Sequence, residues 1–266
     1  MTRVAVVGHV EWVDFIPVER FPLPGEVLHA EEPFTRAAGG GGVVAVVLAE
    51  LGAEVDFFCA LGRDAHGRAA AAQLAERGVQ VHVAWRREPT RRAVTLLQDT
   101  GERTIVTLGE RLAPLGSDDL DWERLREARC VYVTAGDAGA LERAGKAGKV
   151  VASPRAREAL LGDGPAIEAL VFSAHDRDES EWANRVAHRA RVLVATEGAE
   201  GGRWWGRSGG SWSAAPPPGE LRDAYGCGDS FAAGVTFALA TAATIAEAVQ
   251  LGAWCGARCL TRAGAP

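Results

Sequence analysis

Lysine is almost absent from this chain. Only Lys146 and Lys149 occur among its 266 residues, so nearly all of the positive charge is arginine, and the net charge at pH 7 is −6. An acidic protein of this kind is a poor candidate for non-specific binding to nucleic acid or to a membrane surface. We therefore expect neither nucleic acid nor a membrane among its partners.

The chain also lacks the signs of a disulfide framework, a zinc site or a membrane span. It has five cysteines, an odd number, and no two of them show C-x-x-C spacing, which argues against structural disulfides and structural zinc. No segment reaches the roughly 20 apolar residues needed to cross a bilayer. The N-terminus runs into a strand-like segment without a cleavage-type site. These absences predict a cytoplasmic protein.

Several common enzyme motifs are missing as well. The sequence contains neither the G-x-x-x-x-G-K-[ST] loop of P-loop kinases nor the H-R-D and D-F-G segments of protein kinases. The first predicted strand ends in Gly8-His9-Val10-Glu11 rather than in G-x-G-x-x-G, which argues against a Rossmann dehydrogenase. The chemistry must therefore lie in other segments.

What the chain does have is an alternation of short β-rich runs with Ala- and Leu-rich helical runs. Helices are expected at 64–78, with Asp64 as its N-cap, and at the C-terminus from about 245 to 262. This rhythm predicts an α/β fold with a mainly parallel sheet covered on both faces. The length suits a single domain over 1–266. Strands are expected at 3–8, 54–61, 79–85, 130–136, 149–153, 169–174 and 191–198.

Two regions, about 10–35 and 92–108, do not follow this rhythm. The first contains a proline-rich loop and a strand-like stretch at 26–34, and the second reads as a hairpin around Thr100-Gly101-Glu102. We interpret both regions as parts of a small β appendage that acts as a lid.

The strongest chemical signal is Gly226-Cys227-Gly228-Asp229, at the start of a predicted helix over 229–241. The glycines permit a tight turn, and the free N–H groups of a helix's first turn can bind an anion. A hydroxyl between Asp229 and a phosphate held there would be well placed for deprotonation and attack, which is what phosphoryl transfer requires. The four residues alone leave open the alternative that Asp229 merely caps the helix.

Two weaker signals are glycine-rich. The run Gly39 to Gly42 precedes an apolar helix and could admit a ligand to its N-terminus, or could be a flexible turn. The segment 196–202 (TEGAEGG) follows a predicted strand, at the edge of a parallel sheet where ligands sit, or could be an ordinary hairpin turn.

Taken in order, these pieces resemble the ribokinase-like carbohydrate kinases, also called the phosphofructokinase B family. DAYGCGDSFAAGVTFAL is similar to the family's C-terminal signature D-x-x-G-A-G-D-x-F, its most specific motif. AAGGGGVVAVVLAELG resembles its glycine-rich helix, DTGERTIVTLGE its G-E-R hairpin and VATEGAEGG its T-x-G-x-x-G nucleotide segment. The resemblance runs nearly end to end.

The resemblance implies an α/β/α sandwich with a small β lid and an ATP-dependent kinase that acts on a small-molecule acceptor. Asp229 would be the general base, and Mg²⁺ would be required, with K⁺ left open. Asp223 would order the signature loop beside that monovalent cation, and many relatives form homodimers through the lid. The anion hole for the γ-phosphoryl would comprise Gly226, Cys227 and Gly228. The nucleotide would lie by Thr196, Gly198 and Gly201. The acceptor would face Gly39, Gly40 and Gly41.

This chain departs from the family at the acceptor. The family's sugar kinases carry an Asp five residues after the first-strand glycine, where this chain has Val13. Glu11 lies on the same strand face and Asp14 on the other; either carboxylate could bind the acceptor, and Glu11 is preferred. The family's Asn after the glycine run is Val43. The resulting apolar and acidic pocket would suit a nucleoside or a substituted ring better than a free hexose.

Two further motifs are altered. The N-x-x-E motif that arranges Mg²⁺ through water is best matched by Ser173-Ala174-His175-Asp176, with Asp176 in place of Glu. The D-P-n-x-R segment appears as Ser153-Pro154-Arg155. We predict a kinase for a sugar, a sugar phosphate or a nucleoside. A kinase for a non-sugar alcohol, such as a vitamin precursor, and a non-catalytic nucleotide- or metabolite-binding protein remain alternatives.

Overall fold

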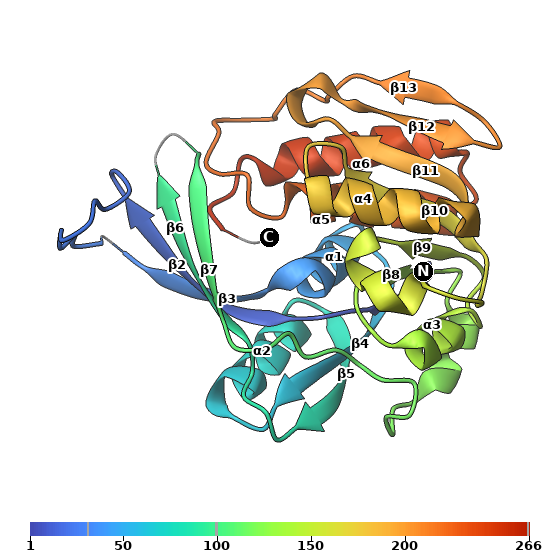
Figure 1. Cartoon of the computed structure of the whole chain (residues 1–266), viewed down its shortest axis with the longest axis horizontal. Helices are drawn as coiled ribbons and strands as arrows, with labels where there is room; N and C mark the ends of the chain where they lie inside the picture. The colour runs from blue at the N-terminus through green and yellow to red at the C-terminus, as the bar shows by residue number, and fades with distance from the viewer. Residues whose placement is uncertain (31, 99–100, 265) are drawn as a thin grey trace.

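A computed structural model describes residues 1–30, 32–98, 101–264 and 266. Two sheets organise the chain, a large one in the main body and a small one that projects from it (Figure 1). In spatial order, the large sheet contains β13 (Gly210–Trp212), β12 (Gly202–Gly206), β11 (Ala190–Thr196), β10 (Ile167–Ser173), β9 (Val150–Ala152), β8 (Cys130–Val133), β1 (Arg3–Val7), β4 (Glu54–Gly62) and β5 (Val79–Arg86).

The seven strands from β11 to β5 all pair in parallel, as the sequence predicted. Only β12 and β13 are antiparallel, at one edge. These two strands were not predicted, because they are short, are bounded by glycine and do not alternate between apolar and polar residues over enough positions.

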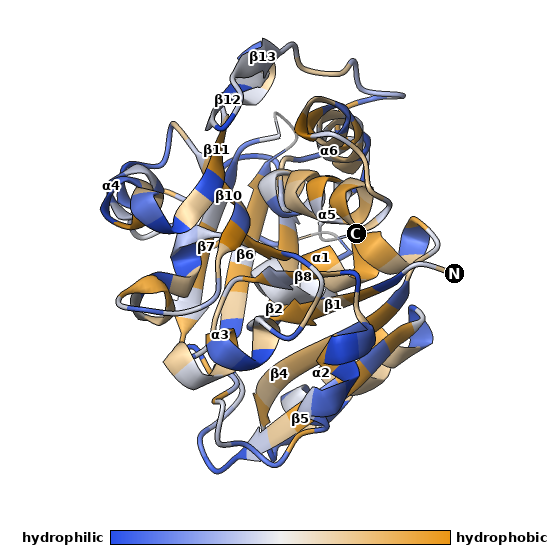
Figure 2. Cartoon of the chain, turned by 90° about the vertical axis from the view of Figure 1, so that its right-hand side faces the viewer, coloured by the Kyte–Doolittle hydropathy of each residue, from blue (hydrophilic) through white to orange (hydrophobic). Residues whose placement is uncertain are grey.

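Helices cover both faces of the large sheet, which makes a three-layer α/β/α sandwich. Residues of β1 alternate between two separate hydrophobic cores, with Val4 and Val6 in one and Ala5 and Val7 in the other. Figure 2 shows α3 and α4 on one side of the sheet and α5 and α6 on the other. The first core is covered by α1 (Gly39–Glu50), α2 (Ala65–Glu76), α5 (Cys227–Ala240) and α6 (Ile245–Cys259). The second is covered by α3 (Ala138–Ala144), α4 (Arg177–Val186) and the 3-10 segments η1 (Trp122–Glu127) and η2 (Pro154–Leu160).

Helix ends follow their capping residues. Asp64 caps α2 as predicted, because its side chain accepts a hydrogen bond from the Gly67 N–H at 2.7 Å. The last helix, α6, begins with a capping box formed by Thr244 and Glu247. Within the described part of the chain, none of the helices combines the length and the apolar character that a membrane crossing requires.

The small sheet comprises β3 (Phe34–Ala38), β2 (Glu11–Val18), β6 (Arg92–Gln98) and β7 (Arg103–Leu108), in that order. The predicted hairpin of 92–108 is confirmed, although Thr100 lies outside the described residues. The strand predicted at 26–34 is wrong. The strand β3 begins only at Phe34, which pairs with Phe15 of β2. Pro17 also belongs to β2 but lies beyond this last pair, so the missing N–H of Pro17 costs no hydrogen bond to β3.

Candidate active site

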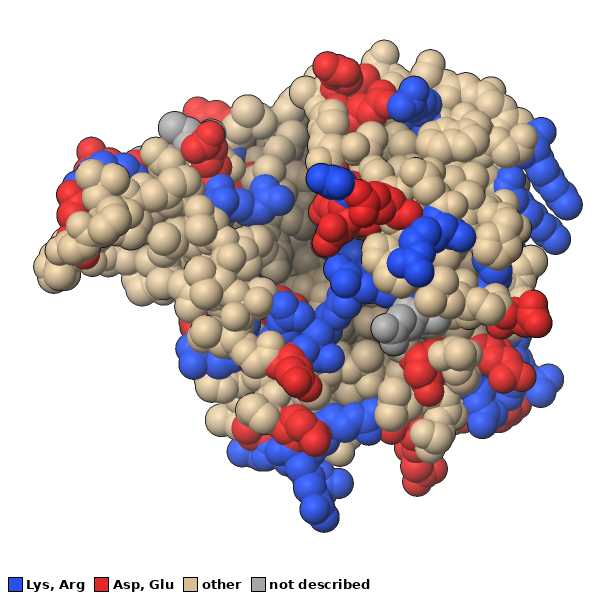
Figure 3. All heavy atoms as spheres, in the orientation of Figure 1, with Lys and Arg blue, Asp and Glu red and all other residues tan. Residues whose placement is uncertain are grey.

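Some of the predicted site residues, among them Asp229, Gly40 and Thr196, lie at the carboxyl ends of the large sheet's parallel strands. There the N-termini of α1 and α5 meet the ends of β1 and β8, and the small sheet leads away through β2. Figure 3 shows a hollow between the small sheet and the main body, with acidic and basic side chains around its rim. Ligands of open α/β sheets bind at this edge.

The first turn of α5 carries the Gly-Cys-Gly-Asp motif. Gly226 is the N-cap and has a φ of +76°, a left-handed conformation that glycine adopts without strain. The N–H groups of the first helical turn have no intrahelical acceptor. Gly228 is exposed, and a Cβ on it would meet no atom within 4 Å. This turn can therefore accommodate an anion.

Asp229 ends the motif and lies largely buried, with its side chain 15% exposed. Its Oδ1 is 3.3 Å from Arg155 Nη1. Burial raises the pKa of the Asp229 carboxyl above its ordinary value, and the positive charge of Arg155 opposes that shift. A carboxylate with a raised pKa is a better proton acceptor than an ordinary aspartate, which suits a general base.

Arg155 also binds a second carboxylate that the sequence reasoning missed. Its Nε lies 2.5 Å from Glu179 Oε1, while Glu179 Oε2 accepts a hydrogen bond from the Ser173 N–H at 2.9 Å. Glu179 is buried although it lies in the first turn of α4. One guanidinium thus joins the two carboxylates Asp229 and Glu179 across the hollow.

Asp176, predicted to approach Mg²⁺ through water, is the N-cap of α4. Its side chain accepts a hydrogen bond from the Glu179 N–H at 3.0 Å. The carboxylate that faces the site is therefore the one three residues later. The signal that could have found it is the D-x-x-E spacing of 176–179, which reproduces N-x-x-E in the first turn of a helix.

The glycine run forms the first turn of α1 rather than a loop before it. A Cβ on Gly40 would lie 3.1 Å from Asp229 Oδ1, and one on Gly39, which has a φ of +80°, would lie 3.3 Å from Glu11 Cγ. These two glycines therefore border Asp229 and Glu11, and their role toward the acceptor stays a prediction. Gly41 is packed instead against His9, where a Cβ would approach the carbonyl oxygen to 2.7 Å.

The residues predicted for the acceptor separate in the structure. Glu11 lies beside Gly39 and Arg91, with its Oε1 3.2 Å from Arg91 Nε, and burial raises the pKa of its carboxyl. Asp14 lies on the opposite face of β2 and forms an ion pair with Arg92 Nη2 at 2.7 Å. Only Glu11 therefore reaches the hollow.

Val43 does not line the hollow. Its side chain is 1% exposed and packs at Gly226, where a Cβ would approach Val43 Cγ1 to 3.1 Å. Val13 is fully buried. The expected apolar acceptor pocket is therefore not formed by these two valines, which belong to the core.

His9 is a second residue that the sequence reasoning missed. Its Nε2 accepts a hydrogen bond from the Gly40 N–H at 3.3 Å, and burial, followed by the charges of nearby arginines, lowers its pKa well below the ordinary value. The neutral ring then carries its proton on Nδ1, which has no hydrogen-bond partner among the described residues. The same is true of the buried Thr134 Oγ1. Both side chains lie against Gly40, beside Asp229.

The segment predicted to bind the nucleotide lies at the end of β11. Thr196 pairs with Ser173 of β10 and donates its hydroxyl to the Phe172 carbonyl at 3.3 Å. Gly198 and Gly201 both have positive φ and form the turn to β12 through the 3-10 segment η4 (Gly198–Glu200). The turn is thus a hairpin connection between β11 and β12. It follows β11, the neighbour of β10, and β10 ends at Ser173, whose N–H donates to Glu179.

Asp223 joins two distant segments. Its two oxygens accept hydrogen bonds from the Tyr225 N–H at 2.7 Å and the Gly264 N–H at 2.6 Å. Burial raises the pKa of this carboxyl, and the two N–H groups oppose the shift. The side chain orders the loop before α5 as predicted. Across the described residues, no three His, Cys, Asp or Glu side chains form a cluster that would hold a metal ion by itself.

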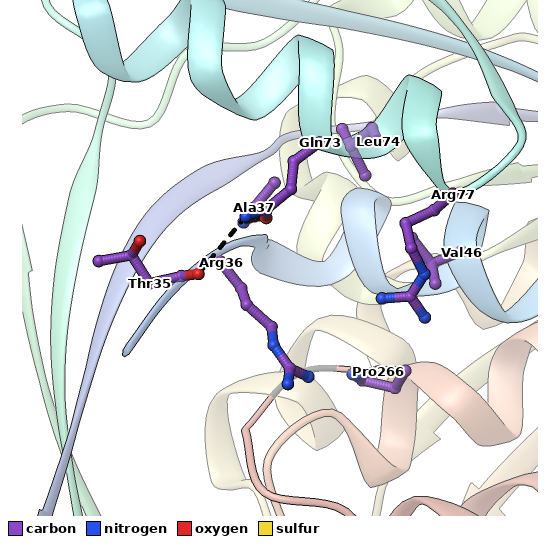
Figure 4. Close-up of a pocket in the computed structure, with 8 residues that line it drawn as sticks. All are labelled: Thr35, Arg36, Ala37, Val46, Gln73, Leu74, Arg77 and Pro266. Atoms are coloured by element: carbon purple, nitrogen blue, oxygen red, sulfur yellow. Dashed lines mark hydrogen bonds between the residues drawn. The ribbon is translucent and has the colours of Figure 1, made fainter. Parts of the chain in front are cut away.

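A separate cavity lies elsewhere. It has a volume of about 200 Å³ and lies where β3 packs on α1 and α2, and Gln73 Oε1 accepts the Ala37 N–H there at 2.7 Å (Figure 4). None of the predicted site residues lines it. Its lining is Thr35, Arg36, Ala37, Val46, Gln73, Leu74, Arg77 and Pro266.

Comparison with known proteins agrees with this geometry. A model described as pfkB family carbohydrate kinase matches residues 1–154 and 166–266. An ATP-dependent ribose-1-phosphate kinase of Halopiger xanaduensis is 30% identical over an alignment of 288 positions that covers 100% of this chain and 94% of that protein. A ribokinase of Arabidopsis thaliana is 35% identical over 136 residues, and this match spans 48% of the chain and only 36% of that protein.

Solved structures show the same fold. The structure of Arabidopsis thaliana ribokinase complexed with ribose and ATP has a TM-score of 0.74 and 24% identity, and covers 100% of this chain and 95% of that one. A microbiome-derived acarbose kinase has a TM-score of 0.82 and 26% identity, with coverages of 99% and 94%. The ribokinase-like fold is thereby confirmed. Since the family model matches most of the chain, this protein belongs to the pfkB family of carbohydrate kinases and is a phosphotransferase that acts on an alcohol group.

Proposed function

We propose that this protein transfers the γ-phosphoryl group of ATP to a hydroxyl of a sugar or of a sugar-containing small molecule. The observation that carries the proposal is the position of Asp229, whose carboxylate lies in the first turn of α5 beside N–H groups that can bind an anion. The names of the two relatives described above, a ribokinase and an ATP-dependent ribose-1-phosphate kinase, support a sugar acceptor and ATP as donor.

Asp229 accepts the proton of the acceptor hydroxyl as that oxygen attacks the γ-phosphorus. The bond between this phosphorus and the bridging oxygen of ATP breaks, and ADP leaves with the electron pair. The N–H groups of Gly226, Cys227 and Gly228 stabilise the negative charge on the transferring phosphoryl oxygens. Arg155, held by Glu179, keeps Asp229 in place and ionised.

The donor set fits a magnesium ion that arrives with the nucleotide. Mg²⁺ is usually bound by one or two carboxylates together with substrate phosphates. The Glu179 carboxylate would be its ligand from the protein, while Asp229 stays free to accept the proton. Bound there, Mg²⁺ would neutralise phosphate charge. Thr196, Gly198 and Gly201 are proposed to lie by the nucleotide. K⁺ stays a prediction, because the structural role of Asp223 is explained by its two N–H partners.

The small sheet is proposed to act as a lid. It begins at β2, whose first residue, Glu11, reaches the hollow, so closure of this sheet would bring acceptor contacts and exclude water together. Exclusion of water limits wasteful hydrolysis of ATP. Dimer formation through the lid remains a prediction from the family resemblance.

The proposal is tested by ADP formation from Mg-ATP with a panel of acceptors. The panel comprises pentoses, hexoses, sugar phosphates, nucleosides and vitamin-type alcohols. Acceptor-dependent turnover with one sugar-bearing class supports the proposal. Turnover only with a non-sugar alcohol, or binding of ATP without turnover for any acceptor, would replace it by one of the alternatives named from the sequence.

A further inference from the structure

Among the described residues, Arg111 is an arginine of the site that forms no ion pair. It follows β7 and is partly buried, and within that part of the chain its side chain donates one long hydrogen bond, from Nη2 to the Arg155 carbonyl at 3.5 Å. Within the described residues no carboxylate lies within 4 Å of its guanidinium. Burial lowers the pKa of the Arg111 guanidinium, the like charges of Arg91 and Arg157 lower it further, and the charge of Glu11 opposes the shift.

Arg91 stands next to it from the other side. This residue directly precedes β6, and its carbonyl accepts the Trp12 N–H at 3.0 Å, which fixes it at the base of the small sheet. Its side chain is 20% exposed, and its one ion pair, Nε to Glu11 Oε1 at 3.2 Å, lacks hydrogen-bond geometry. Most of the donors of this guanidinium are therefore free for a ligand.

Contacts tie both arginines to the site: Arg91 pairs with Glu11, and Arg111 contacts the carbonyl of Arg155, whose guanidinium meets Asp229. The charges of Arg91 and Arg111 act on Glu11 and His9, in addition to the larger effect of burial on those two residues. Arg91 thus stands at Glu11, where the acceptor is proposed to lie. Arg111, whose charge also acts on Glu11, lies beside the Arg155–Asp229 pair.

Holding a partly buried guanidinium beside a like charge is unfavourable unless an anion compensates it. The planar fork of arginine binds phosphate or carboxylate through two parallel hydrogen bonds. We propose that Arg91 and Arg111 bind an anionic substituent of the acceptor, a phosphate or a carboxylate, so that the acceptor is an anionic sugar and not a neutral one. This inference rests on the proposed kinase function and defines its substrate class.

The arrangement also explains why an apolar pocket was wrongly expected. The sequence places valine at positions 13 and 43, where relatives have sugar-binding polar residues, but both valines are buried in the core. The groups that the structure brings to the site are charged, and two of them, Arg91 and Arg111, come from segments that flank the strands of the lid hairpin.

The test compares matched acceptors on three proteins. Initial rates of ADP formation are measured with a neutral pentose, its monophosphates and the corresponding sugar acid, on wild type, Arg111→Gln and Arg129→Gln. Arg129 is the matched control, because it is exposed and precedes β8 at the opposite end of the strands. Thermal denaturation checks that each variant is folded.

We expect wild type to use an anionic sugar at least 100-fold better in kcat/KM than the neutral pentose. Arg111→Gln should raise the KM for that sugar at least tenfold and leave the KM for ATP unchanged, and Arg129→Gln should change neither. Comparison of the pentose monophosphates with the sugar acid shows whether the site binds a phosphate or a carboxylate. Arg111→Lys, which keeps the charge but loses the fork, should lie between wild type and Arg111→Gln.

Two results would overturn the inference while leaving the kinase function intact. One is equal use of neutral and anionic sugars with no effect of Arg111→Gln. The other is a rise in the KM for ATP alone, which would assign Arg111 to the nucleotide. Absence of turnover with every acceptor would instead overturn the proposed function itself, on which the inference depends.

Discussion

Arg155 Nη1 lies 3.3 Å from Asp229 Oδ1, a contact that joins residues 74 positions apart in the sequence. It connects η2 with the first turn of α5 and sets a positive charge next to the proposed base. The same guanidinium is fixed by Glu179 at 2.5 Å, so the base is oriented by a chain of two charged side chains.

This contact predicts a shift of the pH profile. Burial raises the pKa of Asp229 and Arg155 opposes the rise, so removal of the guanidinium in Arg155→Gln should raise the pKa further. Because the base works only when ionised, activity falls as pH drops through that pKa, and the acid limb of kcat/KM should move to higher pH by about 1 unit.

The matched control for this profile is Arg177→Gln, which removes an exposed arginine paired with Glu181 on the surface of α4. It should leave the acid limb unchanged. An acid limb that stays in place in Arg155→Gln would show that the guanidinium does not act on the base.

Gly228→Ala is predicted to lower turnover without lowering the stability of the fold. A Cβ there would meet no atom within 4 Å, and alanine is the better helix former, so Gly228→Ala should leave the free energy of unfolding unchanged or raise it by up to about 1 kcal/mol. Turnover should nevertheless fall at least tenfold, because the methyl group would occupy space beside the transferring phosphoryl group.

Chemical denaturation and initial rates together check this prediction. Gly256→Ala in α6 is the helical control, since its Cβ would make an ordinary contact at 3.4 Å with the Cys227 carbonyl. Full activity in Gly228→Ala would argue that no phosphate binds at this turn.

Glu11 and Asp14 are predicted to differ in effect. Glu11→Gln should raise the KM for the acceptor about tenfold, because an amide oxygen accepts a hydrogen bond from the acceptor hydroxyl less strongly than a carboxylate does. Asp14→Asn removes only a partly exposed ion pair with Arg92, so the acceptor KM should change less than twofold, and stability by no more than about 1 kcal/mol. Equal effects of the two substitutions would contradict the assignment of strand faces.

Asp223 is predicted to matter for stability. Asp223→Ala would leave the buried Tyr225 and Gly264 N–H groups without their acceptor, which should lower the free energy of unfolding by about 2 kcal/mol. Urea denaturation measures this, and Asp223→Asn should lose less, since one amide oxygen still accepts. An unchanged midpoint in the alanine variant would mean that the loop is held by other contacts.

Much of the fold could be predicted from local patterns. The buried parallel strands are continuous apolar runs, as in VVA at 150–152, and α2 begins at an aspartate and is followed by Gly78, so sequence periodicity and caps located them. The edge strands β12 and β13 could not be found this way, because tertiary pairing rather than their own pattern makes them strands.

The site was predictable only in part, for a similar reason. The Gly-Cys-Gly-Asp motif is local, so its position at a helix start followed from spacing. The contacts of Arg155 with Asp229 and Glu179, and the position of Arg111, depend on segments that only the sheet order brings together. Val43 was predicted at the acceptor from its position in the motif, which says nothing about burial, and the structure shows its side chain buried.

The measurement that tests the central claim most directly is kcat of Asp229→Asn with the best acceptor, alongside its thermal stability. The account predicts a loss of about 10³-fold or more in kcat, because a positioned base is removed. Stability should be preserved or raised, because a buried charge with a raised pKa is removed. A folded Asp229→Asn variant with kcat within tenfold of wild type would contradict the assignment of Asp229 as the base.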